Sequence, residues 1–585
     1  MLKLFPRRAR SRLAVLMDDA GPPLSQEILT LFQRYSSSGC MYASHFCKFL
    51  NEIQQERDVT ENCASELMRS CLDVLPGPQF NEKQFLQYLV DTRLNFAIQN
   101  EIRQDMTLPL SHYYIFTSHN TYLKGNQLIS ESSEKPIIKA LQKGVRVVEL
   151  DLWPGAKEDI NVVHGRTLTS PVKFERCISA IKENAFLKSQ YPLIITLEVH
   201  LPEPLQARAA KIIMDTFGSQ LYYPPSSQEL AQFPSPEKLK GRILISTKPP
   251  KEYCQPSNGV YSKYAAQDSD CNDLSWDEEE EIDDDDKDRP PEQQKFVSQD
   301  FMKIITIRQG KIGKSLSDAL RVEEHAKRIS LSEPQLSKIA ASRPTTVVRF
   351  TQDNILRIYP RGWRVDSSNY NPMKAWLVGA QMVALNTQRY GKHLWVMEGF
   401  FRANGGCGYV KKPDFLISKD SSTSSNHTSK YITPEVKQTL KVKVCMGFGW
   451  REQLGNDSFD KSSPPDFYVR AGIAGMKADK VMKETAVKKD EWEPSWEDEF
   501  VFMLRVPELA VLRIKVQEDN RTGPEFAGQI CLPVSELRSG YRVVNLCDER
   551  GNVWELVKLL LYIDLSYSPS PWFSTKRHFT KCSVL

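Results

Sequence analysis

Val145-Arg146-Val147-Val148-Glu149-Leu150-Asp151-Leu152-Trp153 is a run of β-forming residues that carries two carboxylates. In a strand, residues i and i+2 point to the same face, so Glu149 and Asp151 would project together. Two neighbouring carboxylates repel unless a positive charge lies between them, and a divalent cation with oxygen ligands would fill that place. Taken alone, the pair is better explained as a strand end whose acids face solvent or pair with lysine than as a metal site. The neighbouring segments must decide between the two interpretations.

Polar side chains also follow three other runs of apolar residues. His119 and Asn120 come after the first run, His164 comes after the second, and Glu198 ends the third. Because barrel active sites lie at the carboxyl ends of the strands, the pattern predicts a (β/α) barrel with these groups at one end. Two histidines beside hard oxygen ligands suit an enzyme that breaks a phosphodiester with a bound cation. The expected strands are 113–116, a strand ending at 163, 192–198 and 302–307, and the expected helices are 135–143 and 172–184.

The segments that carry these histidines and acids resemble the first catalytic half of eukaryotic phosphoinositide-specific phospholipase C. Four later motifs, in the same order, resemble the second catalytic half of that family. The resemblance covers residues 20–566, and the lack of a pleckstrin-homology domain ahead of the first repeat looks like the plant type. The four motifs are Leu356-Arg357-Ile358-Tyr359-Pro360, Gly362-Trp363-Arg364, Asp366-Ser367-Ser368-Asn369-Tyr370 and Asn404-Gly405-Gly406-Cys407-Gly408-Tyr409.

The resemblance implies a Ca²⁺-dependent hydrolase acting on phosphatidylinositol 4,5-bisphosphate and related phosphoinositides. The inositol 2-hydroxyl would attack phosphorus to give a cyclic phosphodiester, with a ligand carboxylate taking its proton. His119 would stabilise the phosphoryl charge. His164 would protonate the departing diacylglycerol oxygen and then activate water, which releases inositol phosphate. The resemblance implies one Ca²⁺ bound by Asn120, Glu149, Asp151 and Glu198.

Headgroup recognition is implied at four other positions. The family's contacts to the inositol headgroup match Ser330, Arg357 and Tyr359 in the second half and Lys248 near the end of the first. A further lysine of the family is replaced here by Ser246. The sequence therefore predicts one cation fewer near the ring phosphates and leaves the preferred phosphorylation state open.

The segment ahead of the barrel has helical apolar spacing and stands where the family has EF-hands. An EF-hand loop needs acids at its first, third and fifth positions and glycine at its sixth. Ser36, Ser37 and Ser38 precede Gly39 instead. We therefore expect a structural helical pair that binds no Ca²⁺ at this loop.

The C-terminal part alternates apolar and polar residues from Leu440 onward, which predicts an all-β sandwich. Pro464-Pro465-Asp466-Phe467-Tyr468-Val469 and Pro494-Ser495-Trp496 resemble a C2 domain, which holds Ca²⁺ in its end loops. The third loop departs from the family pattern, so weaker Ca²⁺ binding than usual is expected. The candidate C2 ligands are Asp460, Asp466, Glu518 and Asp519, and Lys477, Lys480, Lys483, Lys488 and Lys489 offer a second, electrostatic contact with a membrane.

At 585 residues the chain should hold several domains. The fold class is a degenerate EF-hand-like helical region, a split (β/α)8 barrel and a C-terminal C2 sandwich. The boundaries are a basic N-terminal segment (1–20), the helical domain (21–106), the first half-barrel (107–250), an acidic disordered linker (251–299), the second half-barrel (300–417), a flexible linker (418–433), the C2 domain (434–566) and a tail (567–585).

Charge is distributed unevenly. Residues 268–288 hold thirteen acids and one lysine, so this segment carries −12 and the rest of the chain carries +16. The basic remainder would be drawn to an anionic membrane, and no nucleic-acid-binding motif accompanies it. A tethered acidic segment beside a basic catalytic face could compete with phosphate, although it fits a passive connector as well.

The twelve cysteines are scattered, and no signal peptide or long apolar run is visible. We expect a monomer in the cytoplasm that docks peripherally on the cytoplasmic face of the plasma membrane, with no regulator identified by the sequence. The terminal Cys582-Ser583-Val584-Leu585 matches a prenylation motif, although four-residue patterns also arise by chance.

Two other functions compete with this hypothesis. A catalytically silent membrane-binding scaffold of the same fold would lack part of the catalytic set, but both histidines and all four ligand positions are present. A glycerophosphodiester phosphodiesterase could use a barrel and a divalent cation, but it would not explain the second-half motifs or the C2-like end.

Overall fold

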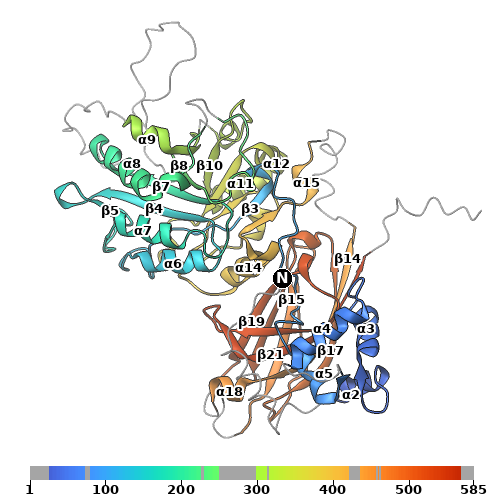
Figure 1. The fold of residues 1–585 in the computed structure, drawn as a ribbon. Helices are drawn as coiled ribbons and strands as arrows, with labels where there is room; N and C mark the ends of the chain where they lie inside the picture. The colour runs from blue at the N-terminus through green and yellow to red at the C-terminus, as the bar shows by residue number, and fades with distance from the viewer. Residues whose placement is uncertain are drawn as a thin grey trace, which may run out of the picture.

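The computed structural model of the chain describes residues 25–72, 79–224, 230–249, 298–312, 315–419, 435–455, 459 and 463–567. A set of N-terminal helices, an α/β barrel and a β-sandwich follow one another along the chain (Figure 1). The N-terminal helices lie against the sandwich, and the barrel lies at another side of it (Figure 1).

The N-terminal helices enclose an aromatic core that continues into the sandwich. Phe46 and Phe85 are fully buried there, in the same cluster as Met446 and Val543 of the sandwich. Glu56 adds ion pairs to Arg538 and Arg542 of the sandwich, so these helices dock on the sandwich. The elements are α2 Gln26–Arg34, α3 Ala43–Glu52, α4 Glu61–Leu72, α5 Glu82–Leu89 and the antiparallel pair β1 Met41–Tyr42 and β2 Gln79–Phe80.

The barrel wall consists of eight parallel strands in the described part of the chain. Four strands pair in the order β4-β7-β8-β9 and four in the order β10-β11-β12-β3. Parallel bridges between Thr117 and Val147 and between Gln309 and Arg328 join the two sets and close the barrel. The strands are β3 Tyr113–Ile115, β4 Val147–Pro154, β7 Leu193–Val199, β8 Ile243–Thr247, β9 Ile305–Arg308, β10 Arg328–Ser332, β11 Ile355–Tyr359 and β12 Met382–Val383.

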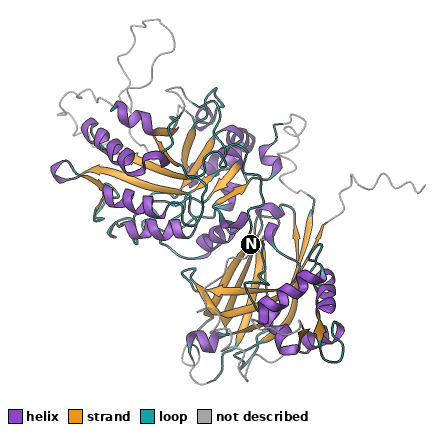
Figure 2. Ribbon diagram, viewed as in Figure 1, coloured by secondary structure: helices purple, strands orange, loops and turns teal. Residues whose placement is uncertain are grey.

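Helices cover the outside of the barrel (Figure 2). Their apolar faces pack on strands that are buried on both sides, as parallel sheets require. The longer helices are α6 Glu134–Gln142, α7 Phe174–Asn184, α8 Glu203–Phe217, α11 Glu333–Ser342, α12 Pro344–Asp353 and α14 Lys392–Phe400, and the shorter ones are α9 Gln299–Ile304, α10 Leu316–Ala319, α13 Met373–Trp376 and α15 Asp414–Ile417.

Two sequence predictions about strands were wrong in part. The strand ahead of His164 is β5 Ile160–Val162, which is antiparallel to β4 and lies outside the barrel wall. Only residues 155–159 connect the two strands, too few for the crossover that a parallel pair needs. The predicted strand 302–307 begins as helix α9 because the Ser298 hydroxyl accepts the Phe301 N–H and caps it.

The described part of the sandwich contains eight antiparallel strands in the order β16-β15-β18-β19-β20-β21-β14-β17. It packs on the barrel through α14, where a Cβ added to Gly399 would lie 2.3 Å from the Cys531 Cβ. Its strands are β14 Gln438–Phe448, β15 Phe467–Ala474, β16 Val481–Glu484, β17 Ser495–Leu504, β18 Val511–Glu518, β19 Glu525–Pro533, β20 Gly540–Cys547 and β21 Val553–Tyr567.

None of the described helices combines the length and apolar composition that crossing a bilayer requires.

Candidate active site

The carboxylates from the opening stretch lie inside the barrel, near the carboxyl ends of the strands. Glu149 and Asp151 are buried on β4, and Asp151 is the register partner of Glu198 on β7. Because register partners on adjacent parallel strands point the same way, Asp151 and Glu198 share a face. Asn120 joins them from the turn after β3, where its backbone N–H donates to Glu149 Oε2 at 3.1 Å. Asn120 has φ of 40°, a conformation that asparagine tolerates better than most residues.

Each carboxylate also has a partner of its own. Glu149 forms an ion pair with Arg357, the Tyr122 hydroxyl donates to Asp151 Oδ2 at 2.6 Å, and Glu198 Oε1 lies 2.8 Å from His200 Nε2. Within the described ranges, no group of three or more acidic, histidine or cysteine side chains is arranged so that it could hold a metal ion.

The electrostatics of the cluster nevertheless fit a divalent cation. Burial raises the pKa of Asp151 well above its usual range, and the carboxylates of Glu198 and Glu149 raise it further. Burial also opposes the ionisation of Glu149, but Arg357 and His119 outweigh it, so the Glu149 pKa is lowered. Asp151 Oδ1 is buried without a hydrogen-bond partner. A hard cation would give this oxygen a partner and offset the repulsion among the three carboxylates.

The two histidines are held through the same ring atom. His119 Nδ1 lies 3.1 Å from Asn386 Oδ1, and His164 Nδ1 lies 2.8 Å from the carbonyl oxygen of Gln127. Because both partners are acceptors, each Nδ1 donates its proton. Nε2 of each ring is then available for a ligand, as acceptor when the ring is neutral and as donor when it is protonated. Burial lowers the pKa of His119, partly offset by Glu149.

Gln127 connects these groups, and the sequence reasoning missed it. Its Oε1 accepts from Asn120 Nδ2 at 2.9 Å, and its Nε2 donates to Asn386 Oδ1 at 3.1 Å and Ser367 Oγ at 2.7 Å. Gln127 therefore contacts Asn120 directly, His164 through its carbonyl and His119 through Asn386. Asn386 follows a buried strand, so the strand-end pattern could have found it, but Gln127 lies in a loop that carries no such signal.

The expected headgroup residues lie in two different environments. Arg357 and Ser330 are register partners on β11 and β10, and Arg357 Nε and Ser330 Oγ are buried without hydrogen-bond partners. The Arg357 guanidinium lies 5.5 Å from the Tyr359 ring centroid. Lys248 is exposed just beyond β8, whereas Ser246 is fully buried and donates to the Ile307 carbonyl.

Exposed apolar side chains surround the entrance to the site. Leu168 and Trp363 are 84% and 71% exposed on loops that follow β5 and β11. The Leu168 N–H donates to the Leu128 carbonyl, directly after Gln127, and the Gln127 N–H donates to the Val365 carbonyl. This rim, defined as Leu128, Ile129, Leu168, Trp363 and Val365, therefore connects directly to the segment that holds His164.

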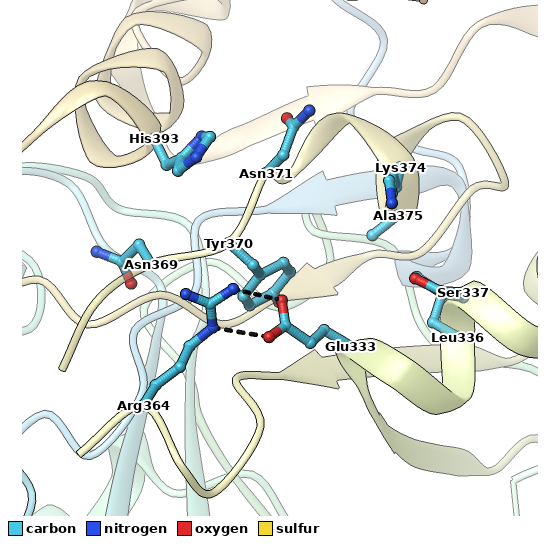
Figure 3. Close-up of a pocket in the computed structure, with 10 residues that line it drawn as sticks. All are labelled: Glu333, Leu336, Ser337, Arg364, Asn369, Tyr370, Asn371, Lys374, Ala375 and His393. Carbon is cyan, nitrogen blue, oxygen red and sulfur yellow. Dashed lines mark hydrogen bonds and ion pairs between the residues drawn. The ribbon is translucent and has the colours of Figure 1, made fainter. Parts of the chain in front are cut away.

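A separate pocket of about 280 Å³ lies beside the loop that carries Trp363 (Figure 3). Arg364 and Glu333 face each other in it through two hydrogen bonds of 2.7 and 3.0 Å. Tyr370 donates to the Ile358 carbonyl, and Asn369 donates to the Asn386 carbonyl. These motif residues therefore position the loop and Asn386, and none of the expected catalytic residues lines the pocket.

Three of the candidate C2 ligands, Asp466, Glu518 and Asp519, lie at one end of the sandwich. The Asp466 carbonyl accepts from the Asp519 N–H at 2.8 Å, and Asp466 Oδ1 accepts from the Asp490 N–H at 2.9 Å. Asp490 is therefore a third acid at this end that the sequence reasoning missed. Glu518 is buried opposite Phe467, on the inward face, and Asp460 lies outside the described residues.

Comparison with known proteins shows which families these regions are similar to. Models of the phosphatidylinositol-specific phospholipase C X domain, the corresponding Y domain and the C2 domain match residues 106–249, 302–415 and 438–547. Phosphoinositide phospholipase C 7 of Arabidopsis thaliana is 45% identical over 571 residues, with 92% of this chain and 95% of the relative covered. 1-Phosphatidylinositol 4,5-bisphosphate phosphodiesterase delta-4 of Pongo abelii is 33% identical, with 92% and 72% covered. The crystal structure of S. officinalis PLC21 shares the fold with a TM-score of 0.73 at 24% identity, with 96% of this chain and 74% of that chain covered.

Proposed function

This chain belongs to the phosphoinositide-specific phospholipase C family and is an enzyme that hydrolyses phosphoinositides, and we propose that it does so with one Ca²⁺ held by Asn120, Glu149, Asp151 and Glu198. Enzymes of this family are generally calcium-dependent. The observation that carries the proposal is Asp151 Oδ1, a buried carboxylate oxygen without a partner beside two further carboxylates. When bound, Ca²⁺ would supply a positive charge that acidifies the inositol 2-hydroxyl and neutralises phosphoryl charge.

We assign separate roles to the two histidines. His119, with Nδ1 fixed on Asn386, presents Nε2 to the phosphoryl oxygens and stabilises their charge. His164 sits on the half-exposed loop after β5, where Nε2 can give a proton to the leaving diacylglycerol oxygen and take one from water. A carboxylate of the cluster takes the proton of the 2-hydroxyl during formation of the cyclic phosphodiester.

The enzyme associates peripherally with membranes, and we propose that the rim residues enter the lipid surface. Their exposed apolar side chains are costly in water and would be buried among acyl chains. The site then opens toward the headgroups of phosphatidylinositol 4,5-bisphosphate and related lipids. The cytoplasmic face of the plasma membrane remains our proposed location, with the chain a monomer there. Cys582 lies outside the described residues, and prenylation at that position stays a prediction.

The domain boundaries given above are likewise proposed, and so is Ca²⁺ binding at the end of the sandwich. The grouping of the described elements into N-terminal helices, a barrel and a sandwich supports the boundaries. Asp466, Asp490 and Asp519 support a C2 site that is weaker than usual because Glu518 faces inward.

A vesicle assay with each phosphoinositide across a Ca²⁺ titration tests the proposal. His119→Ala should lower the hydrolysis rate by about 10²- to 10⁴-fold at every Ca²⁺ concentration, in the range that side-chain proton and charge chemistry contributes. His325→Ala is the matched control because His325 is exposed on the loop ahead of β10. Undiminished activity of His119→Ala would contradict the mechanism.

A further inference from the structure

Arg328, the first residue of β10, is a buried cation for which the mechanism above has no role. Its side chain is 1% exposed, and its Nε has no hydrogen-bond partner. Throughout the residues that the structure describes, no carboxylate lies within ion-pair distance of it. Burial and, to a lesser extent, the neighbouring Arg357 lower its pKa to about 9, although Glu149 opposes the shift. A buried guanidinium without an ion-pair partner is costly, so the position of Arg328 calls for an explanation.

The guanidinium of Arg328 reaches across the barrel interior to the candidate active site. Nη1 donates to Thr196 Oγ1 at 3.3 Å on the opposite wall, and Nη2 donates to Gln309 Oε1. Thr196 is in register with Glu149 on one side and with Ser246 on the other. The charge therefore lies at the level of the carboxylate cluster, next to the strand position where Ser246 offers no charge.

Arg328 also belongs to a set of unsatisfied donors on one wall. Arg328 and Ser330 are two residues apart on β10 and face the same side, and Ser330 is the register partner of Arg357. Arg328 Nε, Ser330 Oγ and Arg357 Nε are all buried without hydrogen-bond partners. Three buried donors without partners beside a carboxylate cluster are an arrangement that a polyanionic ligand would satisfy.

Arg146 provides a contrast within the same barrel. It is also fully buried, and the described residues place no carboxylate beside it either. Its guanidinium, however, donates to the carbonyls of Ala185, Ser189 and Tyr191, away from the carboxylate cluster. Arg146 is thus a structural arginine of similar burial.

We propose that Arg328 is a specificity-determining residue, the interior cation that favours substrates with phosphates on the inositol ring. The proposal rests on the function proposed above and deepens it. The family has a lysine at the position of Ser246 on β8, and this chain would supply the corresponding positive charge from Arg328 on β10. A cation near the ring phosphates would therefore be kept, but on a different strand.

The test compares kcat/KM for phosphatidylinositol 4,5-bisphosphate with kcat/KM for phosphatidylinositol in mixed vesicles. Arg328→Gln, which removes the charge but keeps a polar side chain, should lower the ratio by about tenfold, as expected for one charged hydrogen bond. The double variant Arg328→Gln/Ser246→Lys returns a cation to the same level and should recover the ratio. It also retains the interior charge, so it gives the decisive measurement if Arg328→Gln does not fold.

Arg146→Gln is the matched control and should lower the melting temperature without changing the ratio. His119→Ala should lower turnover of both lipids by about 10²- to 10⁴-fold, and undiminished turnover would refute the proposed function independently of the ratio. An equal loss on both lipids, or an unchanged ratio in Arg328→Gln, would overturn the specificity role of Arg328. So would a double variant whose ratio stays low.

Discussion

Gln127 shows how much of the candidate site depends on residues that touch neither cation nor substrate. One side chain and one carbonyl group set the orientation of Asn120, His164 and, through Asn386, His119. A side chain of this kind fixes which ring nitrogen carries the proton, which the mechanism requires of both histidines.

Gln127→Leu should therefore lower kcat by about tenfold to hundredfold, the usual cost of losing a supporting partner of a ligand or catalytic group. The pH dependence of kcat should also change, because the network that holds His119 is broken. Gln388→Leu is the matched control, since Gln388 donates to the Gly125 carbonyl in the loop of Gln127 and to Ser367 in the loop after β11 but contacts neither histidine. Equal effects of the two substitutions on kcat and its pH profile would contradict the positioning role.

At this scale, sequence reasoning was informative where a functional residue follows a buried strand. His119, Asn120, Glu149 and Asp151 all lie in one buried region, as strand-end placement predicts. Gln127 and Arg328 do not follow buried strands, so this pattern could not find them. Their roles arise only when the barrel closes and brings Asn386 to one and Thr196 to the other.

At the scale of elements, the barrel, the parallel strands and the all-β end were predictable from apolar patterning. Local features decided the two places where the prediction was wrong. The hairpin of β4 and β5 results from a short connection, and the cap at Ser298 turns the start of the predicted strand 302–307 into helix α9. Short apolar runs fit a helix and a strand equally well, so periodicity alone could not separate these cases.

The loop after β11 carries the prediction that belongs to this scale. Trp363 is exposed at the entrance, with the Arg361 guanidinium 4.1 Å from its ring centroid. Trp363→Ala should reduce activity on vesicles about tenfold or more, since burying an indole in lipid contributes a few kcal/mol. Activity on a soluble short-chain substrate should be unchanged. Leu187 is an exposed apolar residue between α7 and β7, at the opposite end of the barrel, and Leu187→Ala should change neither activity. If Leu187→Ala lowered activity on vesicles as much as Trp363→Ala, the result would argue against a local role for the loop.

At the scale of the whole molecule, two candidate Ca²⁺ sites lie on separate bodies of one chain. The barrel holds the carboxylate cluster, and the sandwich holds Asp466, Asp490 and Asp519 at one end. Either site could make activity on membranes depend on Ca²⁺, one through chemistry and the other through docking. A soluble substrate separates them because it removes the need for docking.

The Ca²⁺ concentration for half-maximal hydrolysis of a soluble short-chain phosphoinositide is therefore the most direct test of the catalytic Ca²⁺ site. Asp151→Asn removes the charge of the carboxylate whose Oδ1 has no partner, while keeping its shape. The account predicts that this variant needs at least about tenfold more Ca²⁺ and reaches a lower maximal rate, whereas Asp466→Asn behaves like the wild type. A wild-type Ca²⁺ dependence in Asp151→Asn would contradict the account.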